Sequence, residues 1–350
     1  MAKNVSSELS PDSWTLRLFD SLTLGGWVSR LLPVAFLLFP LPAQDGQARQ
    51  AFELQGEVHL EAGGRLRRAR ALVTLHGAWT PFAAQTWTDL GGRFKFSKLP
   101  AGLYNLTAEV PRRGVRRESV DISASLADDR GRIRRIITLQ PVSTQQTATV
   151  SARQLTIAEK ARKEYIRAQK KLSQRKVDQA VAHLEKAVRL APHFSRALNN
   201  LGTIAFQRQH YEKARQFFQQ ARQADPMAYN PLVNLGGALI QLQDFPRALK
   251  VNQEAVAMRP QDPLAHSQLG RSYMYLGKDE QAVEHLSRAR DLDPGHFSFP
   301  RLSLAQAHWR NGRREEAAKE LEEFLRRHPD APQAESVRQQ LADLSPSNDP

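Results

Sequence analysis

The ten histidines are the side chains of this sequence best suited to metal binding or acid–base catalysis, and most of them are scattered. His183, His193 and His210 do not have the spacing of a metal-binding pair. His266 and His285 lie on neighbouring predicted helices and are expected to approach each other, but no carboxylate pattern accompanies them. The sequence has no cysteine, which excludes disulfides, thiolate-bound zinc and a cysteine nucleophile. We therefore predict no metal site.

Motifs that hold phosphates or activate a nucleophile are missing. The sequence has no Gly-x-Ser-x-Gly elbow, no Gly-x-x-x-x-Gly-Lys phosphate loop and no Gly-x-Gly-x-x-Gly dinucleotide motif. Adjacent carboxylates, such as Glu315 with Glu316 and Glu322 with Glu323, are typical of solvated helix faces. We predict that the protein is not an enzyme, has no catalytic residue and needs no cofactor.

Positive charge is concentrated in a few segments. The chain has 50 Lys and Arg against 36 Asp and Glu, a formal charge of +14. Three arginine clusters lie at 65–70, 112–117 and 130–135, and Lys160–Lys176 is a fourth basic segment. One interpretation is a surface for an anionic envelope polymer, a lipid surface or an acidic partner. The other is solvated loops, strand edges and a helix face, which we favour because no aromatic residue is interleaved with the arginine clusters.

The strongest pattern is a repeat of 34 residues in the second half of the chain. Four sets recur at this spacing: Pro192, Pro226, Pro260 and Pro294; Ala180, Ala214, Ala248 and Ala282; Ala187, Ala221, Ala255 and Ala289; and Gly202, Gly236 and Gly270. This period and these residue types resemble the tetratricopeptide repeat. The resemblance covers residues 156–345 and implies five helical hairpins followed by a cap helix at 333–344.

The resemblance also implies a binding surface. The first helices of stacked hairpins line a concave face that suits an extended peptide or a partner helix. The residues expected in this groove are Asn199, Thr203, Phe206, Gln207, Asn234, Ile240, Gln241, Ser267, Gln268, Arg271 and Tyr275. Asn200 and Asn234 are also candidates for hydrogen bonds between helices. We predict a protein or peptide as the partner, and we do not expect nucleic acid.

Two repeats depart from the family pattern. The first has Glu164 and Arg167 where large apolar residues are usual, which suits an N-terminal capping unit. The third has Asn252 at an apolar position of its second helix, which predicts a local weak point or a buried polar contact.

Residues 50–141 have the period of two that is typical of β-strands. Apolar residues alternate from Phe52 to Leu60, and the pattern returns in short segments separated by Gly, Pro and Asp. The segment Thr88–Phe96 has the composition of a hairpin, with Asp89 and Gly91–Gly92 in the turn. These features predict an antiparallel β-sandwich.

The β region resembles the carboxypeptidase regulatory-like domain. The matching segments are Gly56–Val58, Ala71–Leu75, Thr88–Asp89, Gly92–Phe96 and Leu99–Tyr104. The resemblance implies a transthyretin-like sandwich that serves as a spacer or interaction module and has no catalytic residue. The His-x-x-Glu pair of zinc carboxypeptidases is absent from the sequence.

The first 48 residues have the pattern of an export signal. Residues 31–43 form an apolar run of 13 residues with three prolines, which is short for a membrane-spanning helix. Small residues around Ala43 and Gly46–Ala48 offer cleavage points for a signal peptidase. An uncleaved membrane anchor is the alternative. Either predicts an exported protein that is periplasmic or associated with the cell envelope.

Together these patterns predict a multidomain protein with α and β parts. A leader at 1–48 precedes an antiparallel β-sandwich at 50–141, a polar linker at 142–154 and an all-α repeat solenoid at 156–345. The expected function is a non-catalytic scaffold or adaptor of the cell envelope. The electrostatic binder of an anionic partner remains the alternative.

Overall fold

A computed structural model describes residues 51–62, 65–110, 113–139 and 157–344. The expected leader at 1–48 and linker at 142–154 lie outside the described residues. None of the described helices is long and apolar enough to cross a membrane.

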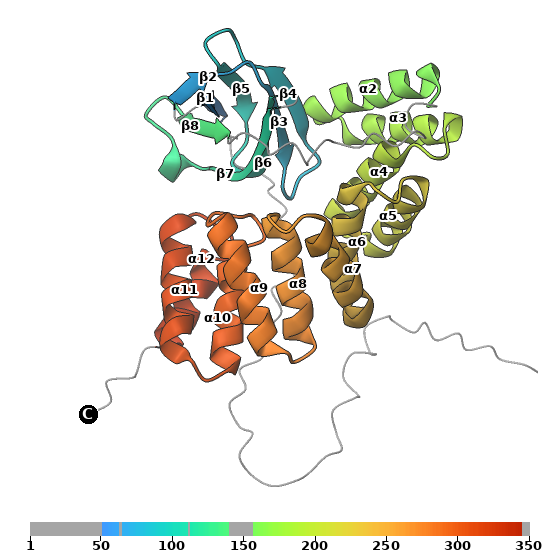
Figure 1. The fold of residues 1–350 in the computed structure, drawn as a ribbon. Helices are drawn as coiled ribbons and strands as arrows, with labels where there is room; N and C mark the ends of the chain where they lie inside the picture. The colour runs from blue at the N-terminus through green and yellow to red at the C-terminus, as the bar shows by residue number, and fades with distance from the viewer. Residues whose placement is uncertain (1–50, 63–64, 111–112, 140–156, 345–350) are drawn as a thin grey trace, which may run out of the picture. The chain divides into compact units, whose positions relative to one another are not determined.

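Two four-stranded sheets form the β region (Figure 1). The strands are β1 (Phe52–Ala62), β2 (Arg65–Arg68), β3 (Leu72–Gly77), β4 (Ala83–Trp87), β5 (Arg93–Leu99), β6 (Gly102–Val110), β7 (Gly114–Ile122) and β8 (Arg132–Leu139). One sheet has the order β2-β1-β5 with β8 on the other side of β1, and the second has the order β4-β3-β6-β7. The predicted sandwich is therefore present.

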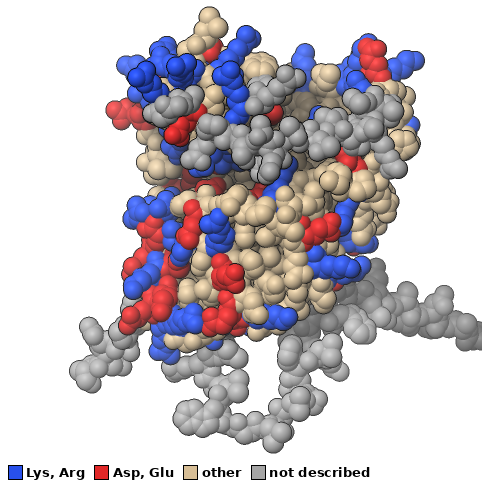
Figure 2. Space-filling view, viewed as in Figure 1, with Lys and Arg blue, Asp and Glu red and all other residues tan. Residues whose placement is uncertain are grey.

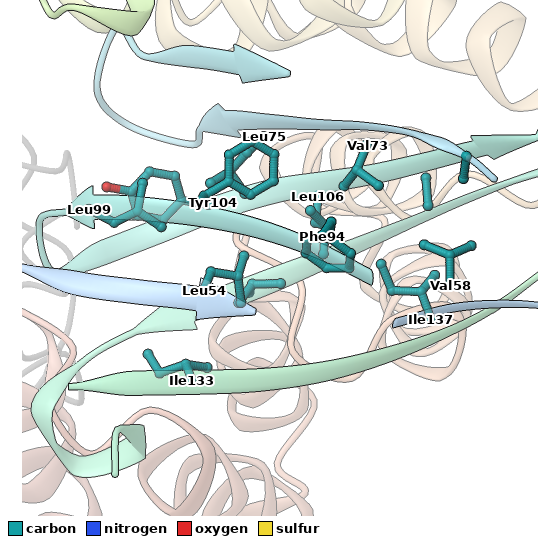
Figure 3. Packing of buried hydrophobic residues seen from close by; sticks show 14 of the residues in the cluster. Leu54, Val58, Val73, Leu75, Phe94, Leu99, Tyr104, Leu106, Ile133 and Ile137 are labelled. Carbon is teal, nitrogen blue, oxygen red and sulfur yellow. The ribbon is translucent and has the colours of Figure 1, made fainter. Parts of the chain in front are cut away.

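The core lies between the sheets because apolar side chains alternate along each strand. Leu54 and Val58 of β1 and Ile133 of β8 point toward Leu75 and Leu106 of the other sheet (Figure 3). All five are at most 1% exposed. The alternation of apolar and polar residues in the sequence therefore corresponds to alternation of buried and exposed side chains along the strands.

The strand pairing differs from the expectation in two places. The predicted hairpin is wrong, because β4 and β5 belong to different sheets. The turn itself forms, with Gly92 at a φ of 73° and its N–H donating to the Asp89 carbonyl at 3.0 Å. β1 and β8 are parallel, from Glu53 opposite Arg132 to Leu60 opposite Leu139, whereas the other pairings are antiparallel.

The arginine clusters lie at sheet edges. Among the described residues, β2 and β8 each pair only with β1, and β7 pairs only with β6. These three strands carry most of the clustered arginines. Charge on an edge strand discourages pairing with a second chain.

Helical hairpins follow in close succession from residue 159 (Figure 1). The pairs are α2 (Glu159–Ser173) with α3 (Val177–Leu190), α4 (Ser195–Gln207) with α5 (Tyr211–Ala224), α6 (Tyr229–Gln241) with α7 (Phe245–Met258), α8 (Pro263–Tyr275) with α9 (Asp279–Leu292), and α10 (Pro300–Arg310) with α11 (Arg314–Arg327). The helix α12 (Ala334–Leu344) packs against α11. Each repeated proline lies two residues after a second helix, where it cannot continue the hydrogen-bond ladder.

Small residues let the two helices of each hairpin approach closely. A side chain on Gly202 would collide with Phe218, and one on Gly270 would collide with Leu286. Gly236 faces Asn252 in the same way. The 34-residue glycine set is thus a set of contact points between paired helices.

Candidate functional site

The expected groove residues lie on α4, α6 and α8, the first helices of three consecutive hairpins. These helices also contact one another directly, α4 with α6 and α6 with α8. Eight of the eleven side chains are partly exposed: Asn199, Thr203, Phe206, Gln207, Asn234, Gln241, Arg271 and Tyr275. The repeat therefore brings side chains up to 76 positions apart in the sequence onto three consecutive first helices.

Amide side chains link successive first helices. The Asn234 Nδ2 donates to Asn199 Oδ1 at 3.0 Å, joining α6 to α4. The Asn200 Nδ2 donates to the Tyr165 hydroxyl at 3.4 Å, joining α4 to α2. The expected interhelical hydrogen bonds of Asn200 and Asn234 are confirmed. These bonds also fix the orientation of the amide side chains.

Three of the expected groove residues are buried. Ile240 packs in the apolar cluster around Ala205 and Phe218. Ser267 is fully buried and accepts a hydrogen bond of 2.7 Å from Ser298. Gln268 lies against Gly237 of α6. These side chains hold neighbouring hairpins together. Each position would be exposed in an isolated repeat and is covered by a helix of the adjacent repeat.

Arg271 and the aromatic residues form the most varied part of this face. The Arg271 guanidinium carbon lies 5.8 Å from the centre of the Tyr275 ring. Tyr275 stacks on Phe245 of α7 with centroids 4.6 Å apart, and Phe206 meets Tyr211 edge-on at 5.3 Å. Aromatic and guanidinium groups held in this way lose little conformational freedom on binding.

The β-sandwich contacts the same series of helices. The described residues of the sandwich and of the helices belong to one compact unit. Gln207 donates from Nε2 to the main-chain oxygens of Gly77 and Thr80, both at 3.2 Å. Phe297, which precedes α10, packs edge-on against Trp79 at 5.9 Å. One expected groove residue is therefore already engaged by the sandwich.

The basic segment at the start of the array surrounds a buried carboxylate. Glu164 is 4% exposed and lies 2.9 Å from Lys186 Nζ, 2.6 Å from His183 Nδ1 and 2.7 Å from Arg167. The hydrogen bonds from Lys186 and then His183 lower the pKa of Glu164 to about 2. The departure from the apolar family pattern is thus a closed ionic cluster. Other basic side chains of α2, among them Lys160 and Lys170, are exposed.

The expected contact between His266 and His285 is present. Their Nδ1 atoms are 3.1 Å apart, and His266 Nε2 lies 3.1 Å from the Pro260 carbonyl. A carbonyl only accepts, so His266 Nε2 carries the proton and its Nδ1 accepts from His285. Burial lowers the pKa of both rings. No group of three or more potential metal ligands occurs among the described residues.

The chain is similar to known proteins in its helical part. Tetratricopeptide repeat family models match residues 165–229, 205–272, 263–296 and 300–344. Anaphase-promoting complex subunit 3 of Schizosaccharomyces pombe is 28% identical over 116 residues, which is 33% of this chain and 17% of that protein. The match thus spans about a sixth of the relative.

Solved structures share the helical fold at low identity. A thermophilic tetratricopeptide-repeat protein of Thermus thermophilus, TTC0263, is 20% identical, with 53% of this chain and 98% of that chain covered and a TM-score of 0.43. YrrB, described as a repeat protein with an unusual peptide-binding site, is 23% identical, with 54% and 98% covered and a TM-score of 0.43. From the family matches, the helical part of this chain, residues 165–344, belongs to the tetratricopeptide-repeat family.

Proposed function

We propose that this protein is a non-catalytic scaffold that binds a peptide or protein segment along the first helices of its repeat array. The observation that carries the proposal is the row of partly exposed amide, aromatic and guanidinium groups on α4, α6 and α8. Amides can pair with the backbone of an extended segment, and Tyr275 and Arg271 offer contacts for its side chains. Proteins of this family are protein-interaction scaffolds, which supports the same function.

We further propose that the scaffold acts in the cell envelope. The apolar run at residues 31–43 and the small residues after it support export. The sandwich would serve as a spacer or docking module of the carboxypeptidase regulatory-like type. The matching segments of the sequence and the two four-stranded sheets support this assignment.

The test is capture of binding partners from an envelope extract by the full-length chain. One bait carries Asn199→Ala, Arg271→Ala and Tyr275→Ala on the first helices. A matched control carries Gln220→Ala, Gln223→Ala and Lys250→Ala, which are exposed positions on the second helices α5 and α7. We expect one discrete protein to be retained at high salt by the wild type and the control, and lost from the groove variant. Equal retention by all three baits would contradict the groove.

A second candidate function rests on α2. Its exposed Lys160 and Lys170 could bind an acidic partner, because Glu164 is already bound by its own three basic neighbours and Glu159 pairs with Lys163. Binding of this kind weakens steeply as salt rises. Capture that disappears at high salt and is reduced by Lys160→Gln with Lys170→Gln would favour this alternative.

A further inference from the structure

One end of the β-sandwich exposes large apolar side chains among arginines. Leu90, at the turn between β4 and β5, is 93% exposed, Leu66 of β2 is 59% exposed and Trp87 of β4 is 50% exposed. Large apolar residues that gather at one surface usually mark a contact site. We call this surface the β2 end; it consists of Arg65, Leu66, Arg67, Arg68, Arg70, Trp87, Leu90 and Arg93.

Backbone contacts fasten the parts of the β2 end to one another. The Ala69 N–H donates to the Val58 carbonyl at 2.9 Å, and the Val58 N–H donates to the Gly92 carbonyl at 2.8 Å. The Thr88 hydroxyl donates to the Ala69 carbonyl at 3.0 Å. The turn that carries Leu90 is therefore held against the end of β2. Residues about 20 positions apart in the sequence, Ala69 and Thr88 to Gly92, therefore lie side by side at this end of the sandwich.

Of the acidic groups nearby, Glu57 and Asp89 are already bound within the sandwich, whereas Glu61 of β1 lies opposite Leu66. Glu57 lies 3.4 Å from Arg68 and 3.6 Å from Arg93, and the Asp89 carboxylate accepts from the Arg93 N–H at 2.8 Å. Within the described part of the chain, Arg65 and Arg67 have no ion-pair partner. Lys and Arg gather over the sandwich in the view of Figure 2. The β2 end thus presents net positive charge to an outside partner.

The arginine cluster at 65–70 contains no aromatic residue, but the fold places Trp87 beside it. The Arg70 guanidinium carbon lies 5.7 Å from the centre of the Trp87 ring, although the two residues come from different segments. Tryptophan prefers the interface between headgroups and acyl chains, and arginine binds phosphate oxygens in a bidentate manner. Side by side, they match the two layers of a phospholipid surface.

We propose that the β2 end docks on a bilayer surface that contains anionic phospholipid. Leu90 at the turn and Trp87 beside it enter the headgroup region, and the arginines bind phosphate groups. Leu90 extends into solvent from a turn, which suits a yielding surface such as a bilayer. Pairing of β2 with an added peptide strand is disfavoured by its arginines. This inference is independent of the groove.

The test uses a local probe in the full-length chain, because the apolar leader can itself bind lipid. The chain has no cysteine, so Leu90→Cys accepts a single polarity-sensitive fluorophore. A matched probe at Met227→Cys, an exposed position between α5 and α6, reports on the array. With vesicles of mixed phosphatidylglycerol and phosphatidylcholine, we expect a blue shift and a brighter signal at position 90 and neither at 227. An unchanged signal at 90, or equal changes at both positions, would overturn the proposal.

Charge variants and other ligands identify what the surface binds. In the Leu90→Cys chain, Arg65→Gln with Arg67→Gln should raise the lipid concentration for a half-maximal signal by about tenfold or more, since each basic residue near an anionic surface adds severalfold to affinity. Arg189→Gln with Arg196→Gln, an exposed pair on α3 and α4 with the same charge change, should leave it unaltered. An equal response to phosphatidylcholine alone, or to soluble polyglutamate, would overturn the assignment to anionic lipid.

Discussion

Glu164 shows how a single carboxylate can organise the first repeat. Three basic side chains from α2 and α3 converge on it, and its pKa is lowered to about 2 from an ordinary value of 4.5. The sequence indicated that this unit is polar where its relatives are apolar. It did not indicate that His183 and Lys186 join Glu164 and Arg167, because these two partners lie on a second helix.

The ionic cluster should make the first repeat sensitive to acid. The folded pKa is the lower one, so the stabilisation is complete above pH 4.5 and is lost as the pH falls toward 2. We expect Glu164→Gln to lower the melting temperature at pH 7 and to remove part of the decline below pH 4.5. Thermal melts followed by circular dichroism over this range measure both effects. Glu185→Gln, at an exposed position of α3, is the control, and identical profiles for the two variants would contradict the prediction.

His296 is a second residue whose titration should make the stability of the folded protein depend on pH. It is buried before α10, and its Nδ1 accepts from the Ser298 N–H at 3.2 Å. Burial lowers its pKa to about 3 from 6.5, so the folded array loses stability as the pH falls from 6.5 toward 3. We expect His296→Asn, which keeps an acceptor but does not titrate, to flatten the decline of the urea midpoint between pH 7 and pH 4. His193→Asn, at an exposed histidine, should leave the slope as it is in the wild type.

At the scale of elements, the 34-residue registers predicted the helical hairpins because each register marks a contact. Glycine and alanine let paired helices approach closely, and proline follows the end of each second helix. These roles recur from repeat to repeat. The sandwich was predicted less completely. The alternation in the sequence indicated strands at Phe52–Leu60, Ala71–Leu75, Arg93–Phe96, Tyr104–Ala108 and Arg134–Leu139. The strands β2, β4 and β7 have no counterpart among them. Two of these three are edge strands rich in arginine, where the apolar alternation is weak. The sequence did not indicate that the chain passes from one sheet to the other after Trp87, because a turn sequence does not specify which strands it joins.

Asn252 departs from the repeat pattern, because it is a polar residue at a position that is apolar in the neighbouring repeats. It is fully buried on α7 and donates to the Ser272 hydroxyl at 3.0 Å, which confirms a buried polar contact there. Its Oδ1 has no hydrogen-bond partner among the described residues. We expect Asn252→Leu to raise the free energy of unfolding by about 1 kcal/mol, because an unsatisfied buried acceptor is removed. Ser272 keeps its bond to the Gln268 carbonyl at 2.9 Å.

Urea unfolding of Asn252→Leu measures this change, with Gln253→Leu at the exposed neighbouring position as the control. Phe218 and Leu286 occupy the matching positions of the adjacent repeats, so leucine fits the register. Gly236→Ala should act in the opposite direction, since its methyl group would collide with Asn252. A less stable Asn252→Leu chain would show that the polar contact stabilises the array.

In the whole molecule, side chains of the helical array contact the β-sandwich. Of the expected groove set, Gln207 contacts the sandwich, and Ile240, Ser267 and Gln268 are buried within the array. Sequence reasoning placed all four on the correct helices. It could not determine which of them another repeat or domain would cover, because that depends on contacts between units.

The end of the array depends on α12. Val337 is fully buried and Ala334 is 3% exposed, while the exposed residues of α12 are mostly polar. We expect a chain that stops at residue 332 to lose roughly 2 kcal/mol from Val337 alone and to bind an apolar dye. A chain that stops at Leu344 retains α12 and is the control. Equal melting temperatures and dye binding for the two chains would show that α12 does not cap the array.

The parallel pairing of β1 with β8 has a mechanical consequence. The chain enters the sandwich at the start of β1 and leaves it at the end of β8, so tension between these points acts along both strands. Eight opposed residue pairs then resist sliding together instead of separating one after another. We expect a higher rupture force in single-molecule pulling between residues 51 and 139 than between the opposed residues 59 and 138. Equal forces would show that the strand pair does not bear the load.

A domain with this geometry can transmit tension from its first strand to its last without unravelling from one end. A force between the two ends of the sandwich therefore loads β1 and β8 along their length.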